Sequence, residues 1–265
     1  METRSLSDRE KHQVMEAAMR AGHILLETGA EISRVEETID RICHHYGIES
    51  GNAFVLSNGI FITMGDSREE YFAKVQHIPV GGAKLDRVAA VNQLSREIES
   101  GMHSIPDLER CLTDIEKMPG KTNRIQILSS AIGSGAFCFL LGGDLADAAA
   151  AFLSGFLLYV YILYFSSRKL SKLVGNIGGG ALVTFLCLIF YHLGLGHHIS
   201  FMIIGSVIPM VPGVAFTNAI RDVADGDYIA GSVRMLDAML VFLSIAIGEG
   251  LVFLLYHRIT GGILL

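Results

Sequence analysis

The sequence predicts an α-helical membrane protein with a small α+β cytosolic domain at its N-terminus. Hydrophobic residues make up 51% of the 265 residues and charged residues 18%, below the roughly 25% that is usual in soluble domains. Most charges lie in the first part of the chain, whereas the second part holds several long apolar segments in succession. We therefore expect a cytosolic domain over residues 1–119 and a transmembrane domain over residues 120–265.

The predicted cytosolic domain begins with two helices. Apolar residues recur at intervals of three and four over residues 8–27 and again over residues 31–46, as they do on one face of a helix. Gly29 ends the first helix, because glycine tolerates the positive φ that helix ends often adopt. Ser33 and Glu36 have the spacing of a capping box for the second helix, although Glu31 and Ile32 suggest an earlier start.

Three strands and two further helices complete this domain. The predicted strands cover residues 52–57, 60–65 and 70–78. Asn58-Gly59 is a strong hairpin signal, Asp66-Ser67-Arg68 indicates a second turn, and Pro79 with Gly81-Gly82 ends the sheet. Helices then resume over residues 84–100 and 106–117. Three strands with helices on one face can fold independently.

Five segments of the second part are long and apolar enough to be membrane helices, which need about 20 residues. They cover residues 124–142, 146–165, 173–193, 199–219 and 235–256. Pro209 and Pro212 remove backbone donors in the fourth segment and break its helix. Inside hydrocarbon, a broken backbone is tolerated only where protein or a water-filled cavity covers it. We therefore expect Pro209, Pro212 and Gly213 to border a solute path.

Ionisable side chains near this break are the other substrate-path candidates, because such groups usually face a protein interior or water. The candidates are Asn218, Arg221, Asp222, Asp227, Arg234 and Asp237. Arg234 and Asp237 lie one turn apart and could pair on one helix face. Glu249, midway along the last segment, is the proton-coupling candidate. The alternatives are an ordinary loop with its charges among the headgroups and, for Glu249, a protonated hydrogen-bonding residue.

Uncharged polar residues and glycines also occur in the membrane segments. Asn176, Asn218, Ser206 and Thr217 could offer neutral contacts to a polar solute. The bare start of the third segment, Gly175 and Gly178 to Gly180, indicates close helix packing. Basic residues mark alternate loops, which predicts a multi-pass protein of the cell (inner) membrane with a cytoplasmic N-terminus and an outside C-terminus. The polar start of the chain predicts no cleaved signal peptide.

The sequence holds no catalytic or cofactor motif, such as a P-loop or a metalloprotease helix. We therefore expect no catalytic residue and no cofactor. Gly29, Glu31, Arg34 and Glu36 belong to the densest polar stretch of the cytosolic domain; they could line a small-molecule site or form a solvated helix start with weak ion pairs. The four cysteines form no C-x-x-C pair, so free thiols and no metal site are expected. A net charge of −6 without a basic tract argues against nucleic acid as a partner.

The chain resembles the threonine/serine exporter (ThrE) family in three stretches. They are Gly29-Ala30-Glu31 with Arg34-Val35-Glu36, Leu85-Asp86-Arg87-Val88 through Asn92-Gln93-Leu94, and Pro209-Met210-Val211-Pro212-Gly213 through Asn218, Arg221-Asp222, Gly226-Asp227, Gly231 and Arg234. The resemblance implies export of a small amino acid or a related organic acid, driven by an ion gradient. Full-length members look like two membrane halves, and this chain looks like the first. That implies a second small membrane subunit or a homo-oligomer.

Three functions therefore follow from the sequence. The first is a transporter subunit in the lipid bilayer that exports threonine, serine or a small dicarboxylate such as succinate, coupled to the proton gradient. The second is a membrane-anchored enzyme whose active part is the domain over residues 1–119. The third is a ligand-sensing scaffold that uses the same domain. Five membrane segments with one broken helix are more than an anchor needs, which favours the transporter.

Overall fold

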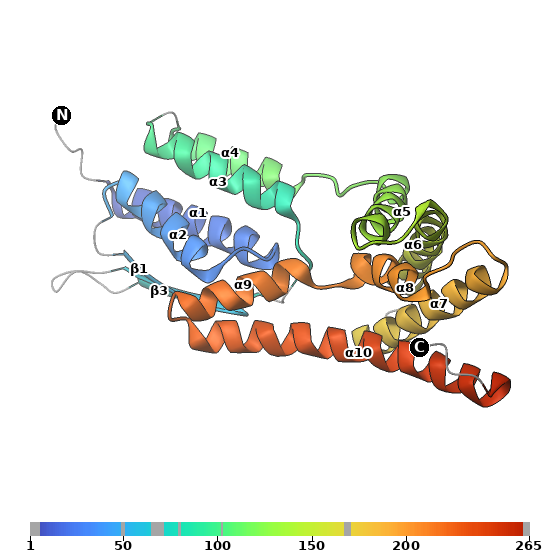
Figure 1. Ribbon diagram of the computed structural model, residues 1–265. Coiled ribbons are helices and arrows are strands. Elements are labelled where there is room, and N and C mark those ends of the chain that lie inside the picture. Colours follow the sequence, from blue (N-terminus) through green and yellow to red (C-terminus); the bar gives the residue numbers. More distant parts are fainter. Residues whose placement is uncertain are drawn as a thin grey trace. The chain divides into compact units, whose positions relative to one another are not determined.

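The computed structural model describes residues 6–48, 51–64, 72–78, 81–101, 103–166 and 171–261. It divides into two compact units (Figure 1). The sheet unit comprises Met1–Pro119 and Gly213–Leu236, and the helical unit comprises Gly120–Pro212 and Asp237–Leu265. Residues 213–236, which the sequence assigns to the membrane domain, thus belong with the N-terminal residues. The division into domains at residue 119 stays a prediction.

The N-terminal part of the sheet unit has the predicted order of two helices, three strands and two helices, and two segments from residues 213–236 join it. Its elements are α1 (Asp8–Glu27), α2 (Ile32–His45), β1 (Gly51–Leu56), β2 (Gly59–Met64), β3 (Phe72–His77), α3 (Leu85–Glu99), α4 (Ile105–Glu116), α9 (Gly213–Ala224) and the start of α10 (Tyr228–Thr260). The sheet is antiparallel in the order β1-β2-β3, and Thr63 of β2 faces Asn52 on one side and Ala73 on the other. The hairpin predicted at Asn58-Gly59 is confirmed. The predicted Asp66-Ser67-Arg68 turn and Pro79 lie outside the described residues.

Close packing of α1 and α2 on the sheet forms the core of this unit. Gly22 of α1 makes the packing possible, since a Cβ there would lie 2.7 Å from Ile39 of α2 and 3.0 Å from Ile60 of β2. Ile39 and Ile60 are both fully buried. Interiors packed this tightly do not accommodate added methyl groups without strain.

Helix α2 begins at the earlier of the two starts that the sequence suggested. Glu31 is its N-cap and makes no side-chain capping bond, so the capping box predicted for Ser33 and Glu36 is wrong. Ser33 is already inside the helix, where its hydroxyl cannot reach the free N–H groups of the first turn. The Glu36 carboxylate instead accepts the backbone N–H of Val55 in β1, at 2.9 Å. Glu36 therefore fixes α2 to the sheet.

The helical unit consists of packed apolar helices. They are α5 (Asn123–Leu140), α6 (Leu145–Ser166), α7 (Lys172–His192), α8 (Ile199–Val207), the 3-10 turn η1 (Ile208–Met210) and the rest of α10. Of the described helices, α6, α7 and α10 are each long and apolar enough to cross a membrane, and α8 with η1 and α9 makes a fourth if the broken pair is one span. Three or four spans are thus supported, and the predicted count of five stays a prediction.

The predicted break in the fourth membrane segment is present. Helix α8 ends at Val207, Pro209 lies in η1, and Val211 is extended with φ −64° and ψ 124°. An extended residue is expected there, because Pro212 disfavours helical geometry at the preceding position. A new helix, α9, begins at Gly213 and continues to Ala224. Helix α10 begins at Tyr228, seven residues before the predicted start at 235.

Candidate functional site

A buried ion pair joins α9 to α10 in the sheet unit. The Arg234 guanidinium of α10 donates to the Asp222 carboxylate of α9 at 2.8 Å, and its second Nη donates to the Ala30 carbonyl at 2.8 Å. Asp222 is 1% exposed and Arg234 9% exposed. Charges removed from water this completely require a partner. Each of these two groups supplies that partner for the other.

The same carboxylate also receives the start of α2. The backbone N–H of Ile32 donates to Asp222 Oδ1 at 3.1 Å. The first N–H groups of a helix have no partner within the helix, and a negative charge is favourable there. Asp222 thus satisfies a helix start that lies 190 residues away in the sequence. The absence of a side-chain cap at Glu31 is explained by this long-range contact.

Polar contacts surround this buried pair. Asn218 donates from Nδ2 to the Gly29 carbonyl at 2.7 Å. Arg221 forms a short ion pair with Glu31, and its side chain is 57% exposed. Gly29 has φ +83°, a conformation that residues with a Cβ rarely adopt. We call the set Glu31, Asn218, Arg221, Asp222 and Arg234, with the backbone of Gly29 to Ile32, the latch cluster.

The latch cluster brings together two predicted polar stretches, Gly29 to Glu36 and Asn218 to Arg234. Arg34 lies at its edge, 3.8 Å from the Glu31 carboxylate. The predicted pairing of Arg234 with Asp237 is wrong, because Arg234 binds Asp222, whose buried carboxylate needs a cation. The assignment of these latch residues to a substrate path stays a prediction. In the structure their side chains bind the turn between α1 and α2.

Asp227 and Glu36 lie near each other beside the latch cluster. Asp227 precedes α10, and its carbonyl accepts the N–H of Gly231 at 2.9 Å. Burial raises the pKa of the Glu36 carboxyl above its ordinary value, and the nearby charges of Asp227 and Asp40 raise it further. The hydrogen bond from the Val55 N–H opposes this rise in the pKa. The charged form of the Glu36 side chain is therefore disfavoured.

A polar pocket of about 300 Å³ lies in the helical unit beside the helix interruption. Met210 of η1 forms part of its wall, so the pocket borders the interrupted backbone. The residues that line it are Tyr161, Ile162, Phe165, Ser171, Lys172, Gly175, Asn176 and Met210. The Tyr161 hydroxyl donates to the Gly175 carbonyl at 3.2 Å. This is a cavity with convergent polar groups, as small-molecule sites usually have.

Lys172 and Asn176 give this pocket its polar character. The Lys172 ammonium donates to both carboxylate oxygens of Asp237 in α10, at 2.7 and 3.0 Å. Asn176 Nδ2 is buried and has no hydrogen-bond partner among the described residues. Asn176 and Asp237 were candidates in the sequence analysis, whereas Lys172 was not. Its position one helical turn before Asn176 could have indicated a shared face.

Glycines of α7 let its neighbours approach this pocket closely. A Cβ on Gly179 would lie 2.7 Å from the Met210 side chain, and one on Gly178 would lie 2.2 Å from the Tyr161 hydroxyl. On α10, a Cβ on Gly248 would lie 2.0 Å from the Ile177 carbonyl. Close helix packing at the glycines of this segment was predicted from the sequence and is confirmed. The small residues keep Met210 and Tyr161 against the pocket.

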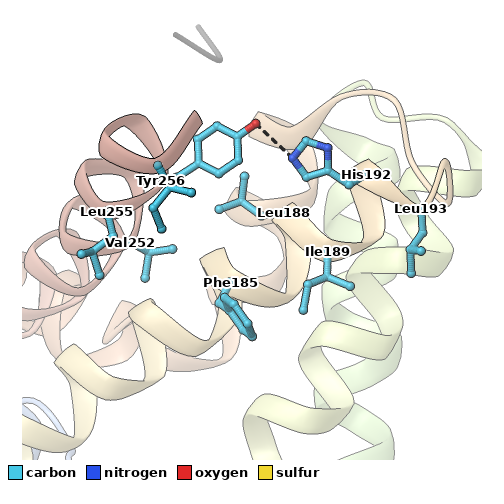
Figure 2. A pocket seen from close by; sticks show the side chains of 9 residues that line it. Phe185, Leu188, Ile189, His192, Leu193, Val252, Leu255 and Tyr256 are labelled. Atoms are coloured by element: carbon cyan, nitrogen blue, oxygen red, sulfur yellow. Dashed lines mark hydrogen bonds between the residues drawn. The ribbon is translucent and has the colours of Figure 1, made fainter. Parts of the chain in front are cut away.

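A second cavity, the apolar pocket of about 460 Å³, lies between α7 and α10 (Figure 2). Its lining residues are Phe185, Leu188, Ile189, His192, Leu193, Val252, Leu255, Tyr256 and Ile259. His192 and Tyr256 are the polar members of this set, and His192 Nε2 and the Tyr256 hydroxyl share a hydrogen bond of 3.0 Å. Because these two groups satisfy each other, the apolar pocket offers little to a charged solute.

Glu249 lies on α10 next to the tightly packed Gly248. Its side chain is half-buried and forms no hydrogen bond or ion pair with another described residue. A carboxylate without a partner in an apolar helix is available for protonation. The coupling role of Glu249 stays a prediction. All four cysteines, Cys43, Cys111, Cys138 and Cys187, are free thiols, as predicted.

Asp144, Asp147 and His197 form a further cluster, where the α5–α6 loop and the first turn of α6 meet the α7–α8 loop. Their potential ligand atoms lie within 4.8 Å of one another. Asp147 is fully buried and accepts the backbone N–H groups of His197 and His198, at 2.6 and 2.9 Å. Asp144 accepts from His197 Nδ1 at 2.7 Å, which raises the pKa of that imidazole. The cluster joins two loops, and the expectation of no metal stays a prediction.

Comparison with known proteins adds to this geometry. The family model ThrE, described as "Putative threonine/serine exporter", matches residues 16–256. The protein named "Threonine/serine exporter" of Corynebacterium glutamicum is 26% identical over 249 residues, which are 90% of this chain and 50% of that protein. The chain therefore spans about half the length of this curated relative. No solved structure matches the chain.

Proposed function

Because this chain belongs to the threonine/serine exporter family, we propose that it is one half of a membrane exporter of a small polar metabolite. The family is a transporter family and not an enzyme family, which argues against the membrane-anchored enzyme. The cargo is threonine, serine or a small dicarboxylate such as succinate. The exporter lies in the inner membrane with its N-terminus in the cytoplasm and its C-terminus outside.

One observation carries this proposal, namely the polar pocket beside the helix interruption. Broken membrane helices bind solutes where their backbone borders a cavity. Met210 in η1 and Lys172 and Asn176 of α7 border one cavity here. Of the predicted path residues, Pro209 belongs to the same 3-10 turn as Met210 and Asp237 binds Lys172. The predicted break thus lies next to the Lys172–Asp237 ion pair, whose charged groups bind a polar solute.

The other half of the path comes from a second membrane component. The chain spans about half of a relative named as an exporter, and three or four of its helices suit a membrane. A separate small membrane subunit supplies the missing helices, with a second copy of this chain as the other arrangement. Glu249 carries the coupling proton, since it is a carboxylate on the apolar helix α10 that has no partner among the described residues.

The test is solute uptake into inside-out membrane vesicles, with and without the second membrane component. Vesicles that hold both components should take up labelled threonine, serine or succinate faster than vesicles from cells without the chain. Lys172→Gln should lower the initial rate at least about tenfold, since a charge-assisted contact is lost. Arg124→Gln, which removes an exposed charge away from the pocket, is the matched control. Equal uptake by vesicles with and without the chain would refute the proposal.

Proton coupling is tested separately. Glu249→Gln keeps the size and hydrogen-bonding capacity of the side chain but cannot carry a proton. The variant should transport with a weaker dependence on the proton gradient than the parent chain. An unchanged pH profile would remove Glu249 from the coupling role and leave the path itself intact.

A further inference from the structure

We infer that the Lys172–Asp237 ion pair is the selectivity element of the polar pocket, an exchangeable pair that binds solutes with one positive and one negative group and rejects dianions. This inference rests on the proposed function, because it names the chemistry that the pocket selects. In the bound state Asp237 takes the ammonium group of the solute. Lys172 and Asn176 take its carboxylate.

The balance of charges in the pocket leads to this assignment. Lys172 is the one charged residue among the described residues that line it, and Asp237 lies against the Lys172 ammonium. A zwitterion presents one charge to each of them, with opposite sign in both cases. Among the described residues, a dicarboxylate would find Lys172 as its one cation in this pocket, and Asp237 would repel it. Like charges at contact distance repel each other even where water partly screens them.

Asn176 supplies the second contact for the carboxylate. Its Nδ2 is buried and has no partner among the described residues. A buried donor without an acceptor is unfavourable by about 1–3 kcal/mol, so it is rarely kept without a use. A solute carboxylate has a free oxygen for this donor while its other oxygen meets Lys172. An unpaired donor beside a cation thus marks the carboxylate end of the site.

The exposure of the ion pair makes the exchange easy. The side chain of Lys172 is 61% exposed and that of Asp237 44% exposed. Pairs this exposed contribute about 1 kcal/mol or less. A solute that offers both groups an equivalent partner therefore separates the pair with little loss. By contrast, the Asp222–Arg234 pair of the latch cluster is buried and is not available for exchange.

The size and the remaining walls of the pocket restrict the solute further. A volume of about 300 Å³ is at the lower end of ligand pockets. Ile162, Phe165 and Met210 supply apolar surface, which suits a short side chain between the two charged groups. The solute class is therefore a small zwitterion with a compact, partly apolar side chain.

Equilibrium binding to the purified full-length chain in lipid nanodiscs tests the inference. The probes are radiolabelled L-threonine and succinate, with N-acetylthreonine and threonine amide as competitors that each lack one charge. The parent chain should bind threonine and prefer it at least about tenfold over succinate and over both competitors. Because these probes need no variant, the result does not depend on the folding of any mutant.

Two single variants assign the charges to the two ends of the solute. Asp237→Asn should weaken threonine binding at least about tenfold. It should also reduce the preference of the site for threonine over N-acetylthreonine, which has no ammonium group. Lys172→Gln should instead reduce the preference of the site for threonine over threonine amide, which has no carboxylate. Arg124→Gln should leave every affinity unchanged. Melting curves of the variants confirm that each is folded.

The outcomes separate this inference from the proposed function. Three results would each overturn the selectivity element. The first is an affinity for succinate equal to that for threonine, and the second is no binding of either probe. The third is threonine binding that is unchanged in Asp237→Asn. Uptake of succinate alone by vesicles would also overturn it, while the exporter proposal would stand. Absence of all uptake would instead refute the proposed function, whatever the binding data give.

Discussion

The latch cluster and the polar pocket are built from similar side chains but use them in opposite ways. In the latch cluster the buried carboxylate of Asp222 binds Arg234 and the N–H of Ile32, and Asn218 binds Gly29. In the polar pocket Asn176 has no partner among the described residues and Lys172 is largely exposed. Both regions contain an Arg or Lys bound to an Asp. One set of contacts is closed, and the other is open to a ligand.

This difference separates the requirements of folding from those of binding. A folded unit keeps buried polar groups only when they are paired. A binding site must leave some of its groups unpaired until the ligand arrives, and it loses stability by doing so. The stretch of sequence richest in charged residues can therefore be a structural contact, whereas groups without a partner can lie among less conspicuous residues.

The largest effect is expected for the buried pair of the latch cluster. Arg234→Ala leaves the Asp222 carboxylate buried without its cation, so the free energy of unfolding should fall by about 3–5 kcal/mol. Chemical unfolding of the purified chain in detergent, followed by circular dichroism, measures this change. Arg110→Ala, at a side chain that is 81% exposed, is the control and should change little. If Arg234→Ala lowered the free energy of unfolding by less than about 1 kcal/mol, the Asp222 carboxylate would not depend on Arg234 as its partner.

The two asparagines give a matched comparison of the two regions. Asn218→Leu removes a hydrogen bond and leaves the Gly29 carbonyl without its donor, which should lower the free energy of unfolding by about 1–3 kcal/mol. Asn176→Leu removes a donor that has no partner, so the stability should stay the same or rise slightly. The same unfolding assay serves both variants. Equal losses at the two positions would contradict the division into a closed and an open region.

A smaller effect is expected at the exposed edge of the latch cluster. Arg221→Ala breaks the ion pair with Glu31, but the Arg221 side chain is 57% exposed, so the loss should be about 1 kcal/mol or less. The loss should also shrink at high salt, which screens exposed pairs. Measuring export with the same variant sharpens the comparison. Transport lost by a stable Arg221→Ala variant would place Arg221 on the solute path.

The smallest effect concerns Glu36, whose pKa is raised by burial and by neighbouring carboxylates. A carboxyl with a raised folded-state pKa favours the folded chain less as the pH rises through that pKa. Glu36→Gln keeps an acceptor for the Val55 N–H and removes the charge. The melting temperature of the variant should therefore exceed that of the parent by a few degrees at most at pH 7. The two should melt alike below about pH 4.

The control for this prediction is Glu37→Gln on the same helix. Glu37 is exposed and pairs with Arg41, so its loss should slightly lower the melting temperature or leave it unchanged. If Glu36→Gln proves less stable than the parent at pH 7, the negative charge of Glu36 is favourable in the fold. Glu36, beside the latch cluster, would then be a further carboxylate that is stabilised in its charged form.

Local patterns predicted most of the elements, because apolar spacing and turn residues act over short stretches of chain. The hairpin at Asn58-Gly59 and the break at Pro209 and Pro212 are of this kind. The contacts of Asp222 with Ile32 and of Lys172 with Asp237 join residues far apart in the sequence. No periodicity contains such pairings, so Arg234 was paired wrongly with Asp237 and Lys172 was not recognised as a pocket residue.

Helix α10 carries contacts of both regions. Its 33 residues form a rod of about 50 Å, longer than the roughly 30 Å of a bilayer's hydrocarbon core. Arg234 and Asp237 lie about 4.5 Å apart along this helix. Arg234 forms the buried contact with Asp222, and Asp237 forms the exposed contact with Lys172. The buried contact of one unit and the exposed contact of the other are therefore carried by a single unbroken helix, less than one turn apart.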